Sequence, residues 1–538
     1  MVLDPDSLET MALTAPTFFE TVDGLISDIS WNWVLIIALA LLTFRFLFPS
    51  GSKKIKLPPS PGAFPIVGSF PLMGAKDGEP AHHMFARLGQ KFGPITYLKM
   101  GANPVIIISN SEVARLVLKD LDHVFSSRPY LTAGKLMGMD FQSVVFAPAG
   151  PHYKRLRKIY NLELLSPKRV TANHSTRENG VYDMLGSIYK THKQGEVTNL
   201  SSLLQDLSLN SLMSMIFGWK DGKMAKTIGK VSMEEVKYVV RQAVELGGEF
   251  NFGDYIAIAR WLDLQGVIGR MKKLTKVMKE MAAALIEEYE RSGKKSPTLP
   301  DATILDVILA LEGDDKLSPD AMSGVMFDMI IAGSDTTSVS SDWTIAELLR
   351  QPKLVRRLQA ELDEMIGKES FVTEADVPKL PFLQAVVKES LRLHPPAPLG
   401  IPHCSTEDCK LAGYDIPAGT TALVNIWAVN RDPNQWPDPL RFDPDRFLDS
   451  DLSVFGTAYH LLPFSSGRRG CPGMLLGLTM VQIIVANLVH SFEFQAAAGL
   501  KNEEIDVVNE TPGLVSTRAQ PLRFNVTPRL PARLFEQL

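Results

Sequence analysis

The stretch PFSSGRRGCPG, residues Pro463 to Gly473, surrounds a single cysteine with glycines and arginines. The chain has 538 residues but only 3 cysteines, too few for a disulfide framework or a CxxC redox pair. Gly467, Gly470 and Gly473 permit tight turns and close approach of the backbone. The apolar segment that follows predicts a helix, whose N-terminal amides favour an anion. The stretch therefore predicts a loop that holds the Cys471 thiolate as a ligand.

A lone thiolate suits one metal centre in particular. It is the proximal ligand with which haem iron cleaves the O–O bond, because the sulfur pushes electron density onto the iron. Other anion-binding loops are excluded, since the chain contains no GKS or GKT and the glycine spacing is not GxGxxG. We therefore expect haem b as the cofactor, Cys471 as the ligand of its iron, and Arg469 in position to pair with a haem propionate.

Phe464, Gly467, Arg469, Cys471 and Gly473 match the signature F-x-x-G-x-R-x-C-x-G of the cytochromes P450. In the order of its motifs the chain resembles the plant microsomal A-type of that family, which includes phenylpropanoid and flavonoid hydroxylases. The resemblance implies a mainly α fold with small β-sheets, in a single catalytic domain with an N-terminal transmembrane helix. It also implies that Phe464 and Gly473 lie at the haem, and that the protein is a haem-thiolate monooxygenase.

Near the N-terminus, residues 31–48 (WNWVLIIALALLTFRFLF) are predominantly apolar. As a helix they span about 27 Å, close to the thickness of a bilayer core. Six acidic residues and no Lys or Arg precede this segment, and three lysines follow it. The positive-inside rule then places the N-terminus in the lumen and the catalytic domain in the cytosol. A cleaved signal peptide is disfavoured, because the basic flank is on the wrong side and no small-residue cleavage site follows. We expect a single-pass protein of the endoplasmic reticulum membrane, in contact with membrane lipid.

The rest of the chain has one boundary, a proline-rich linker that contains LPPSPGAFPIVG. After it, ITYLKMGANPVIIIS predicts a β-hairpin, and apolar residues at three- and four-residue spacing predict helices over most of 111–393. The expected segments are a lumenal N-terminus at 1–30, a transmembrane anchor at 31–48, a linker at 49–68 and a haem-binding catalytic domain at 69–538.

The motif AGSDTT, residues 332–337, lies in a long apolar segment. An acid and a hydroxyl in a buried helix are costly unless they are used. Thr336 can hydrogen-bond back to a backbone carbonyl and leave a groove beside the haem. The resemblance implies that Asp335 and Thr336 are the catalytic pair, which organises water and delivers protons to dioxygen, with Ala332 at the haem. An Asp-Thr cap at a helix break is the alternative.

Glu389 and Arg392, in KESLRLHPP, have the spacing at which two side chains meet on one face of a helix. Their position after AGSDTT resembles the family's buried Glu-Arg pair, and DPDRF supplies Arg446, with Asp445 in place of the usual Glu. The resemblance implies a buried, charge-assisted network with a structural role. Three further pairs share the spacing and are expected to be ordinary helix-surface pairs: Glu112/Arg115, Glu288/Arg291 and Glu347/Arg350.

Three more residues are candidates for contact with the haem propionates. In the family a helix carries W-x-x-x-R for this purpose; here GPHYKRLRKI has Tyr153 in place of Trp, and Arg157 follows four residues later. The aromatic contact is expected to survive the replacement, whereas the hydrogen bond from Tyr153 remains open. His403, in PLGIPHC, falls where relatives place Arg or His against a propionate. A solvated basic face is the alternative for each.

Composition bears on the partners. The chain is 45% hydrophobic and 22% charged with a formal net charge of −4, which gives no indication of a nucleic-acid partner. It contains no flavin or nicotinamide fingerprint, so electrons must come from another protein, which the resemblance implies is NADPH–cytochrome P450 reductase. The basic run YKRLRK, residues 153–158, suits an acidic partner through electrostatic steering, and a solubilising surface is the alternative.

The function expected from these features is hydroxylation. One atom of O2 would be inserted into a small lipophilic or phenolic substrate, in secondary metabolism, with electrons from NADPH through the reductase. One alternative is a reductase-independent P450-fold isomerase or dehydratase acting on hydroperoxides, which the intact Asp335-Thr336 pair disfavours. Another is a haem-free membrane scaffold. The segments expected to line the substrate pocket, 130–145, about 220–253, the start of the AGSDTT helix and 397–401, are mostly apolar and do not identify a substrate.

Overall fold

The computed structural model describes residues 36–37, 40, 55–76, 78–218, 227–228, 231–292, 296, 302–497 and 499–538. The chain divides into two compact units, Met1–Lys56 and Leu57–Leu538. The expected lumenal segment, and the expected anchor apart from residues 36, 37 and 40, lie outside the described residues.

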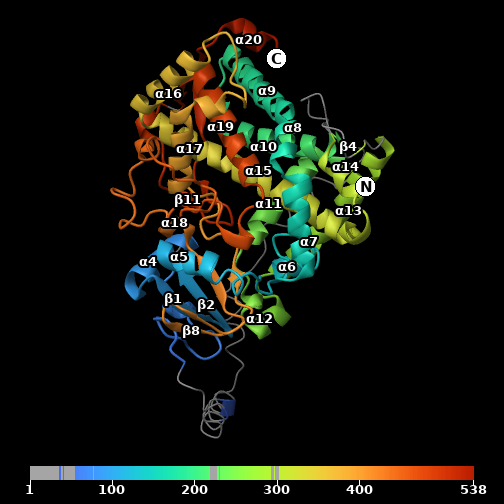
Figure 1. Ribbon diagram of the computed structural model, residues 1–538, viewed down its shortest axis with the longest axis vertical. Helices are drawn as coiled ribbons and strands as arrows, with labels where there is room; N and C mark the ends of the chain where they lie inside the picture. Colours follow the sequence, from blue (N-terminus) through green and yellow to red (C-terminus); the bar gives the residue numbers. More distant parts are fainter. Residues whose placement is uncertain are drawn as a thin grey trace. The chain divides into compact units, whose positions relative to one another are not determined.

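The larger unit is mainly helical, and α15 runs through its interior (Figure 1). Its longer helices are α4 (Ala81–Phe92), α7 (Pro151–Ile159), α9 (His174–Lys193), α10 (Leu200–Phe217), α11 (Met233–Gly248), α13 (Val267–Ser292), α15 (Pro319–Leu349), α16 (Pro352–Met365), α17 (Pro381–Leu393) and α19 (Met474–Ser491). Shorter helices are α5 (Ser111–Arg115), α6 (Thr132–Leu136), α8 (Pro167–Ala172), α12 (Ala257–Leu262), α14 (Ile304–Leu309), α18 (Ile426–Val429) and α20 (Ala532–Glu536).

Local sequence signals set the start of α15. The Ser318 side chain accepts a hydrogen bond from the Ala321 N–H, and Pro319 occupies the first helical position. The helix has no single apolar face and is buried along most of its length, as expected for a helix at the centre of a core. It packs against α10, α17 and α19. Gly333 allows the close approach of α10, because a Cβ atom there would lie 2.8 Å from Leu212 Cδ1.

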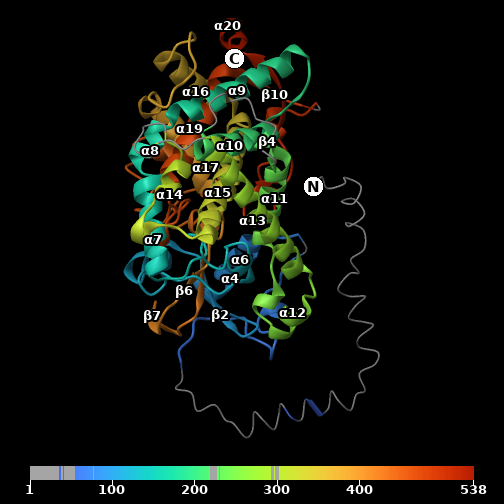
Figure 2. The same cartoon turned by 90° about the vertical axis from the view of Figure 1, so that its right-hand side faces the viewer.

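The β-structure is small and lies at the margins of the helical core. One sheet has the order β1-β2-β9-β6, in which β1 and β2 form the antiparallel hairpin that the sequence predicts. In both views this hairpin lies at the end of the larger unit that carries α12, while α9 and α20 lie at the other end (Figures 1 and 2). The strands of this sheet are β1 (Ile95–Met100), β2 (Asn103–Ile108), β9 (Thr421–Val424) and β6 (His403–Cys404).

A second sheet has the order β10-β13-β3, and three two-stranded pairs complete the described β-structure. The expectation of a mainly α fold with small β-sheets is therefore confirmed. The remaining strands are β10 (Phe492–Ala496), β13 (Arg523–Pro528), β3 (Thr198–Asn199), β11 (Glu510–Thr511), β12 (Thr517–Arg518), β4 (Thr227–Ile228), β5 (Val231–Ser232), β7 (Cys409–Leu411) and β8 (Tyr414–Ile416).

Among the described residues, α19 is the helix that is long and apolar enough to cross a membrane. It is 72% buried within the protein, so its composition reflects a place in the core. It packs against α9, α15, α16 and α17.

The buried charge network that the resemblance implied is present. Arg392 donates to both carboxylate oxygens of Glu389, at 2.7 and 2.8 Å, and also to three backbone carbonyls. Arg446 Nε lies 3.4 Å from Glu389 Oε1. Asp445, which replaces the usual Glu, pairs instead with Arg357, at 2.5 Å. The network ties α17 to the chain that leads into the cysteine loop.

The other pairs at the same spacing differ from one another. Glu288 and Arg291 form the expected exposed pair, at 3.2 Å. The prediction of a helix-surface pair is wrong for Glu347, which is buried and lies 2.8 Å from His394 Nε2. His394 takes the place of the predicted partner Arg350 because α17 ends beside α15. The His394 ring stacks there on Trp343, at a centroid distance of 4.0 Å. Spacing within one helix does not report such a neighbour.

Candidate haem site

The cysteine loop lies directly before α19 and is closed by its own backbone. The Cys471 N–H donates to the Phe464 carbonyl at 2.9 Å, and the Gly470 N–H donates to the Gly467 carbonyl at 3.0 Å. Gly467 has a φ of +71°, and a Cβ atom there would lie 2.3 Å from the Leu118 carbonyl oxygen. The turn therefore requires glycine at this position for two separate reasons.

Opposing influences act on the pKa of the Cys471 thiol. Burial raises the pKa of the thiol, whereas a hydrogen bond from the Gly473 backbone and the nearby Arg157 guanidinium lower it. Burial is the largest influence, so the thiolate is incompletely stabilised by the protein alone. A metal cation at the sulfur would supply the missing stabilisation.

Helix α7 holds the loop from one side. The Tyr153 hydroxyl donates to the Arg468 carbonyl at 2.6 Å, and the Arg469 guanidinium lies 3.5 Å from the centre of the Tyr153 ring. Arg157 donates to the Gly470 carbonyl at 2.5 Å. In this structure the hydroxyl of Tyr153 bonds to the loop backbone and its ring supports Arg469, while its contact with a haem propionate stays a prediction.

Beside the loop lie three basic side chains, of which Arg469 and His403 are buried and Arg128 is partly buried. Arg469 donates to the carbonyls of Ser126 and Ala147, and its Nη1 atom is buried without a hydrogen-bond partner. Arg128 donates only to backbone carbonyls, and neither guanidinium forms a salt bridge with a carboxylate in the described part of the chain. The carbonyls that accept from Arg128 are those of Val145, Ile401 and Pro402.

The pKa values of these basic side chains are lowered, as expected where positive charge has no carboxylate partner. Burial lowers the pKa of Arg128 to about 9 and that of Arg469 to about 10, and the Arg469 charge contributes to the shift at Arg128. Burial also lowers the pKa of His403 to about 3, with Arg128 as the next cause. Buried cations without counter-ions are costly. The carboxylates of a haem would offset that cost, so the residues fit this cofactor.

The AGSDTT motif lies within α15, which is continuous from Pro319 to Leu349, so the alternative of a cap at a helix break is wrong. Thr336 Oγ1 donates back to the Ala332 carbonyl at 2.6 Å, as expected. Ala332 is exposed although much of the helix on either side is buried, which indicates open space beside it. Burial raises the pKa of Asp335 to about 6.

The structure thus joins Tyr153, Arg157 and Arg469 to the cysteine loop by direct contacts, and places Ala332, Asp335 and Thr336 on a helix that packs against α19. Arg128 was missed, because a single Arg in FSSRP carries no pattern of its own. Its role becomes visible only when the chain brings it beside Arg469 and His403.

Comparisons with known proteins agree with this geometry. The sequence profile described as "Cytochrome P450" matches residues 58–524. The chain is 36% identical over 512 residues to cytochrome P450 98A2 of Glycine max, which covers 94% of this chain and 99% of that protein. It is 35% identical over 512 residues to the flavonoid 3'-monooxygenase of Arabidopsis thaliana, with 93% and 97% covered.

Among solved structures, a zebra fish cytochrome P450 with progesterone superposes with a TM-score of 0.70 at 25% identity, covering 84% of this chain and 100% of that chain. Because the family profile and the relatives each span most of the chain, the chain belongs to the cytochrome P450 family and is a monooxygenase of that family, with its fold, with haem as cofactor and with O2 as co-substrate.

Proposed function

We propose that this protein hydroxylates a small phenolic substrate of the flavonoid or phenylpropanoid-ester class, with electrons from NADPH delivered by a cytochrome P450 reductase. The observation that carries the proposal is the cysteine loop backed by Arg128 and by Arg469, which is buried with one unpartnered nitrogen, with the acid Asp335 on the helix packed against α19. The phenolic class is supported by the names of the relatives, which include flavonoid 3'-monooxygenases.

When bound, the haem supplies the activation of O2 that monooxygenation needs. Cys471 would hold the iron, while Arg469, Arg128 and Arg157 would bind the haem carboxylates. His403 would join them once protonated, because its neutral ring donates its Nδ1 hydrogen to the Phe125 carbonyl. Tyr153 acts as a positioning residue, because its hydroxyl and ring fix the loop backbone and the Arg469 guanidinium. These contacts set where the sulfur lies relative to α15.

The chain also supplies a proton donor. Since the pKa of Asp335 is raised to about 6, its carboxyl group can both hold and release a proton near neutral pH, as a general acid requires. The Thr336 hydrogen is committed to the Ala332 carbonyl, which leaves its oxygen free to accept from water. The pair would therefore orient water and pass protons to oxygen.

Substrate would be recognised in part by the segment before α7. Asp328 of α15 accepts a hydrogen bond from the Val144 N–H at 2.7 Å, which ties this segment to α15. Residues 139–141 have positive φ, a sharp turn in a region that was expected to line the pocket. Of the other expected segments, residues 219–226 and 229–230 lie outside the described part of the chain.

The reductase would dock near the cysteine loop, where the exposed side of α7 carries Lys154. The basic run is less uniform than the sequence suggested, because Arg157 faces the loop and Lys158 pairs with Asp315 at 2.7 Å. Electrostatic steering to an acidic partner remains the proposed role of this face.

The experiment that tests the proposal is turnover with purified reductase and NADPH under ¹⁸O2, after a spectral-shift screen of flavonoids, phenylpropanoid esters, fatty acids and terpenes. We expect a phenolic ligand to shift the Soret band, and its product to contain one ¹⁸O atom only when NADPH and reductase are both present. Conversion of hydroperoxides without NADPH would instead establish the isomerase or dehydratase alternative. A purified protein without a Soret band would support the scaffold.

We further propose that the protein is anchored in the endoplasmic reticulum membrane by residues 31–48, with the catalytic domain cytosolic. An exposed apolar surface on the larger unit supports contact with lipid. In α12 the exposed fractions are 64% for Ile258 and 83% for Trp261, and nearby Phe70 lies edge-on to Phe250 at 5.3 Å. Exposed apolar patches mark contacts with protein, membrane or ligand, and we assign this one to lipid because of the apolar segment at residues 31–48.

The full-length chain should therefore stay in the membrane pellet after an alkaline carbonate wash. Because the catalytic domain is expected on the cytosolic side, protease added to intact microsomes should degrade it without detergent. Recovery of the chain in the carbonate supernatant, or protection from protease until detergent is added, would each contradict the proposal.

A further inference from the structure

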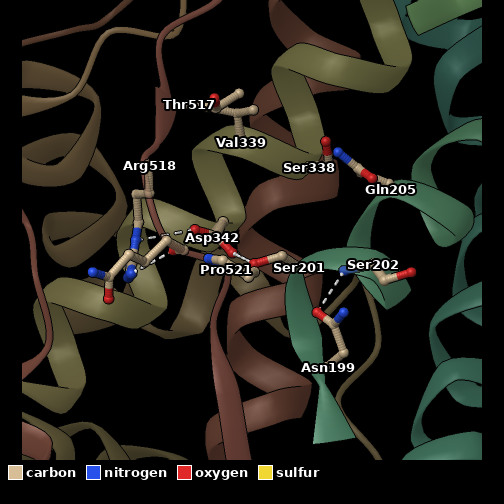
Figure 3. A pocket seen from close by; sticks show the side chains of 11 residues that line it. Asn199, Ser201, Ser202, Gln205, Ser338, Val339, Asp342, Thr517, Arg518 and Pro521 are labelled. Atoms are coloured by element: carbon tan, nitrogen blue, oxygen red, sulfur yellow. Dashed lines mark hydrogen bonds and ion pairs between the residues drawn. The ribbon is translucent and has the colours of Figure 1, made fainter. Parts of the chain in front are cut away.

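A polar pocket of about 380 Å³ lies against the C-terminal half of α15 (Figure 3). Its walls come from α10, α15 and the chain around β12. It is lined almost entirely by hydroxyl, amide and charged side chains, which is unusual for a space that reaches a central helix. From α15 it includes Ser338 and Asp342, from α10 Ser201 and Gln205, and from β12 Arg518.

The pocket and the candidate catalytic acid Asp335 both involve α15 and lie on the same side of that helix. Asp328, Asp335 and Asp342 are spaced seven residues apart. Seven residues are two turns less about 20°, so the three carboxyl groups lie along one side of the helix, about 10.5 Å apart in the axial direction. Ser338 lies between Asp335 and Asp342 on that side, and its hydroxyl donates to the Asp335 carbonyl at 3.0 Å.

Asp342 is held in place from two directions. The Ser201 hydroxyl donates to it from α10, and Arg518 Nε lies 3.4 Å from its Oδ2 atom (Figure 3). The side chains of Arg518 and Asp342 are only 4% and 11% exposed. Ser201 is itself fixed, because its oxygen accepts from the Leu522 N–H at 2.8 Å.

Arg518 is not satisfied by these contacts. Its Nη2 atom donates to the Gln520 carbonyl at 2.9 Å, but Nε and Nη1 are buried with no hydrogen-bond partner in the described part of the chain. Two buried donors at a polar pocket are the setting in which ordered water is found. This side chain therefore points to a hydrated pocket.

We propose that this pocket is the route by which water and protons reach Asp335, and that Asp342 takes up protons from the pocket and orders the water along α15. The inference rests on the proposed monooxygenase function, and it adds a path from solvent that the Asp335-Thr336 pair alone does not provide.

The proton balance requires such a path. Hydroxylation of a C–H bond with O2 and two electrons takes up two protons and releases one water, and both protons come from solvent. In the proposed path a proton from water in the pocket passes to the Asp342 carboxylate. It then moves through ordered water beside the Ser338 hydroxyl to the carboxylate of Asp335. Each group returns to its starting state after transfer, so no further reactant is needed.

The charges around Asp342 suit this role. Burial raises the pKa of Asp342 to about 6, and Arg518 and the Ser201 hydroxyl oppose the shift. The pKa of Asp335 is also raised to about 6 by burial. Two acids of similar proton affinity, on one side of one helix, can exchange a proton in either direction without a large step in free energy.

The direct test replaces Asp342 by Asn in the full-length protein with reductase and NADPH. We expect slower product formation, toward the lower end of the ~10²–10⁴-fold range of general acid–base catalysis, and more hydrogen peroxide per NADPH oxidised. The solvent deuterium isotope effect on turnover should increase. The ferrous–CO spectrum should be unchanged, because Asp342 does not contact the candidate haem site.

Asp320→Asn is the matched control, since it makes the same change on the same helix in an exposed ion pair with Lys279, at 2.8 Å. It should leave rate, peroxide yield and isotope effect as in the wild type. A second variant, Gln205→Trp, fills the pocket from its exposed α10 wall and leaves the Asp342–Arg518 pair intact; it should also raise peroxide yield and isotope effect.

A double-mutant cycle completes the test. If Asp342 acts through Asp335, Asp342→Asn should have almost no further effect in an Asp335→Asn background. Unchanged peroxide yield and isotope effect in both Asp342→Asn and Gln205→Trp, or additive losses in the cycle, would overturn the inference while wild-type turnover still supports the proposed function. Wild-type protein without reductase-dependent turnover would overturn the proposed function, and the inference with it.

Discussion

Replacing Cys471 by Ala should abolish the ferrous–CO band that is characteristic of a thiolate-ligated haem and reduce hydroxylation to background. The loop around Cys471 is shaped by its own hydrogen bonds and by the contacts from α7, so the alanine variant should retain the fold and lose only the sulfur. Without that ligand the iron loses the electron donation on which O–O cleavage depends. The measurement is a reduced-plus-CO difference spectrum, followed by product analysis.

The chain provides two matched controls, because Cys404 and Cys409 are also free and partly buried, and burial raises the pKa of each thiol as it does for Cys471. Cys404→Ala and Cys409→Ala should keep the spectrum and the activity. A thiolate-type band that survived in Cys471→Ala would show that the ligand has been assigned to the wrong residue.

Replacing Glu389 by Ala should destabilise the catalytic domain by about 3–5 kcal/mol, the typical cost of removing one partner of a buried ion pair. Glu389 and Arg392 are both fully buried. Glu389 Oε1 also accepts from the Asp443 N–H at 2.8 Å, so the variant leaves a backbone donor and a guanidinium without their acceptor. The measurement is the midpoint of urea denaturation, with haem retention followed in the same titration.

An exposed pair with the same spacing is the control. Glu288→Ala removes one of the two carboxylate partners of Arg291, which keeps Glu287; the Arg291 side chain is 59% exposed, so the change should cost at most about 1 kcal/mol. A loss for Glu389→Ala no greater than that for Glu288→Ala would mean that the network does not stabilise the core. We expect the first variant to lose haem well before the second as urea increases.

Sequence reasoning reached the parts of the site that are encoded in contiguous residues. The Cys471 loop could be predicted because glycine spacing, a following helix and a lone cysteine share one short stretch. Glu389 was selected over three other pairs only by its order along the chain and by resemblance, since spacing alone does not distinguish a buried pair from an exposed one.

The remainder depends on residues that are far apart in sequence. Glu347 was misread because its partner, His394, lies 47 positions away on another segment. Arg128 could not be identified before it was seen beside Arg469, and the hydrogen bond from Tyr153 to the Arg468 carbonyl joins residues 315 positions apart. The role proposed for Asp342 depends on its contact with Arg518 of β12, which the sequence does not reveal.

The burial of α19 also has a consequence for how the chain is made. A helix with the composition of a membrane span is, before it is packed, a segment that an insertion machinery could accept. The helices against which it packs, α9, α15, α16 and α17, all precede it in the chain and are therefore synthesised first. A variant that delays their assembly would expose α19 next to the membrane. Core mutations in this protein should therefore be tested for membrane insertion of α19 as well as for loss of stability.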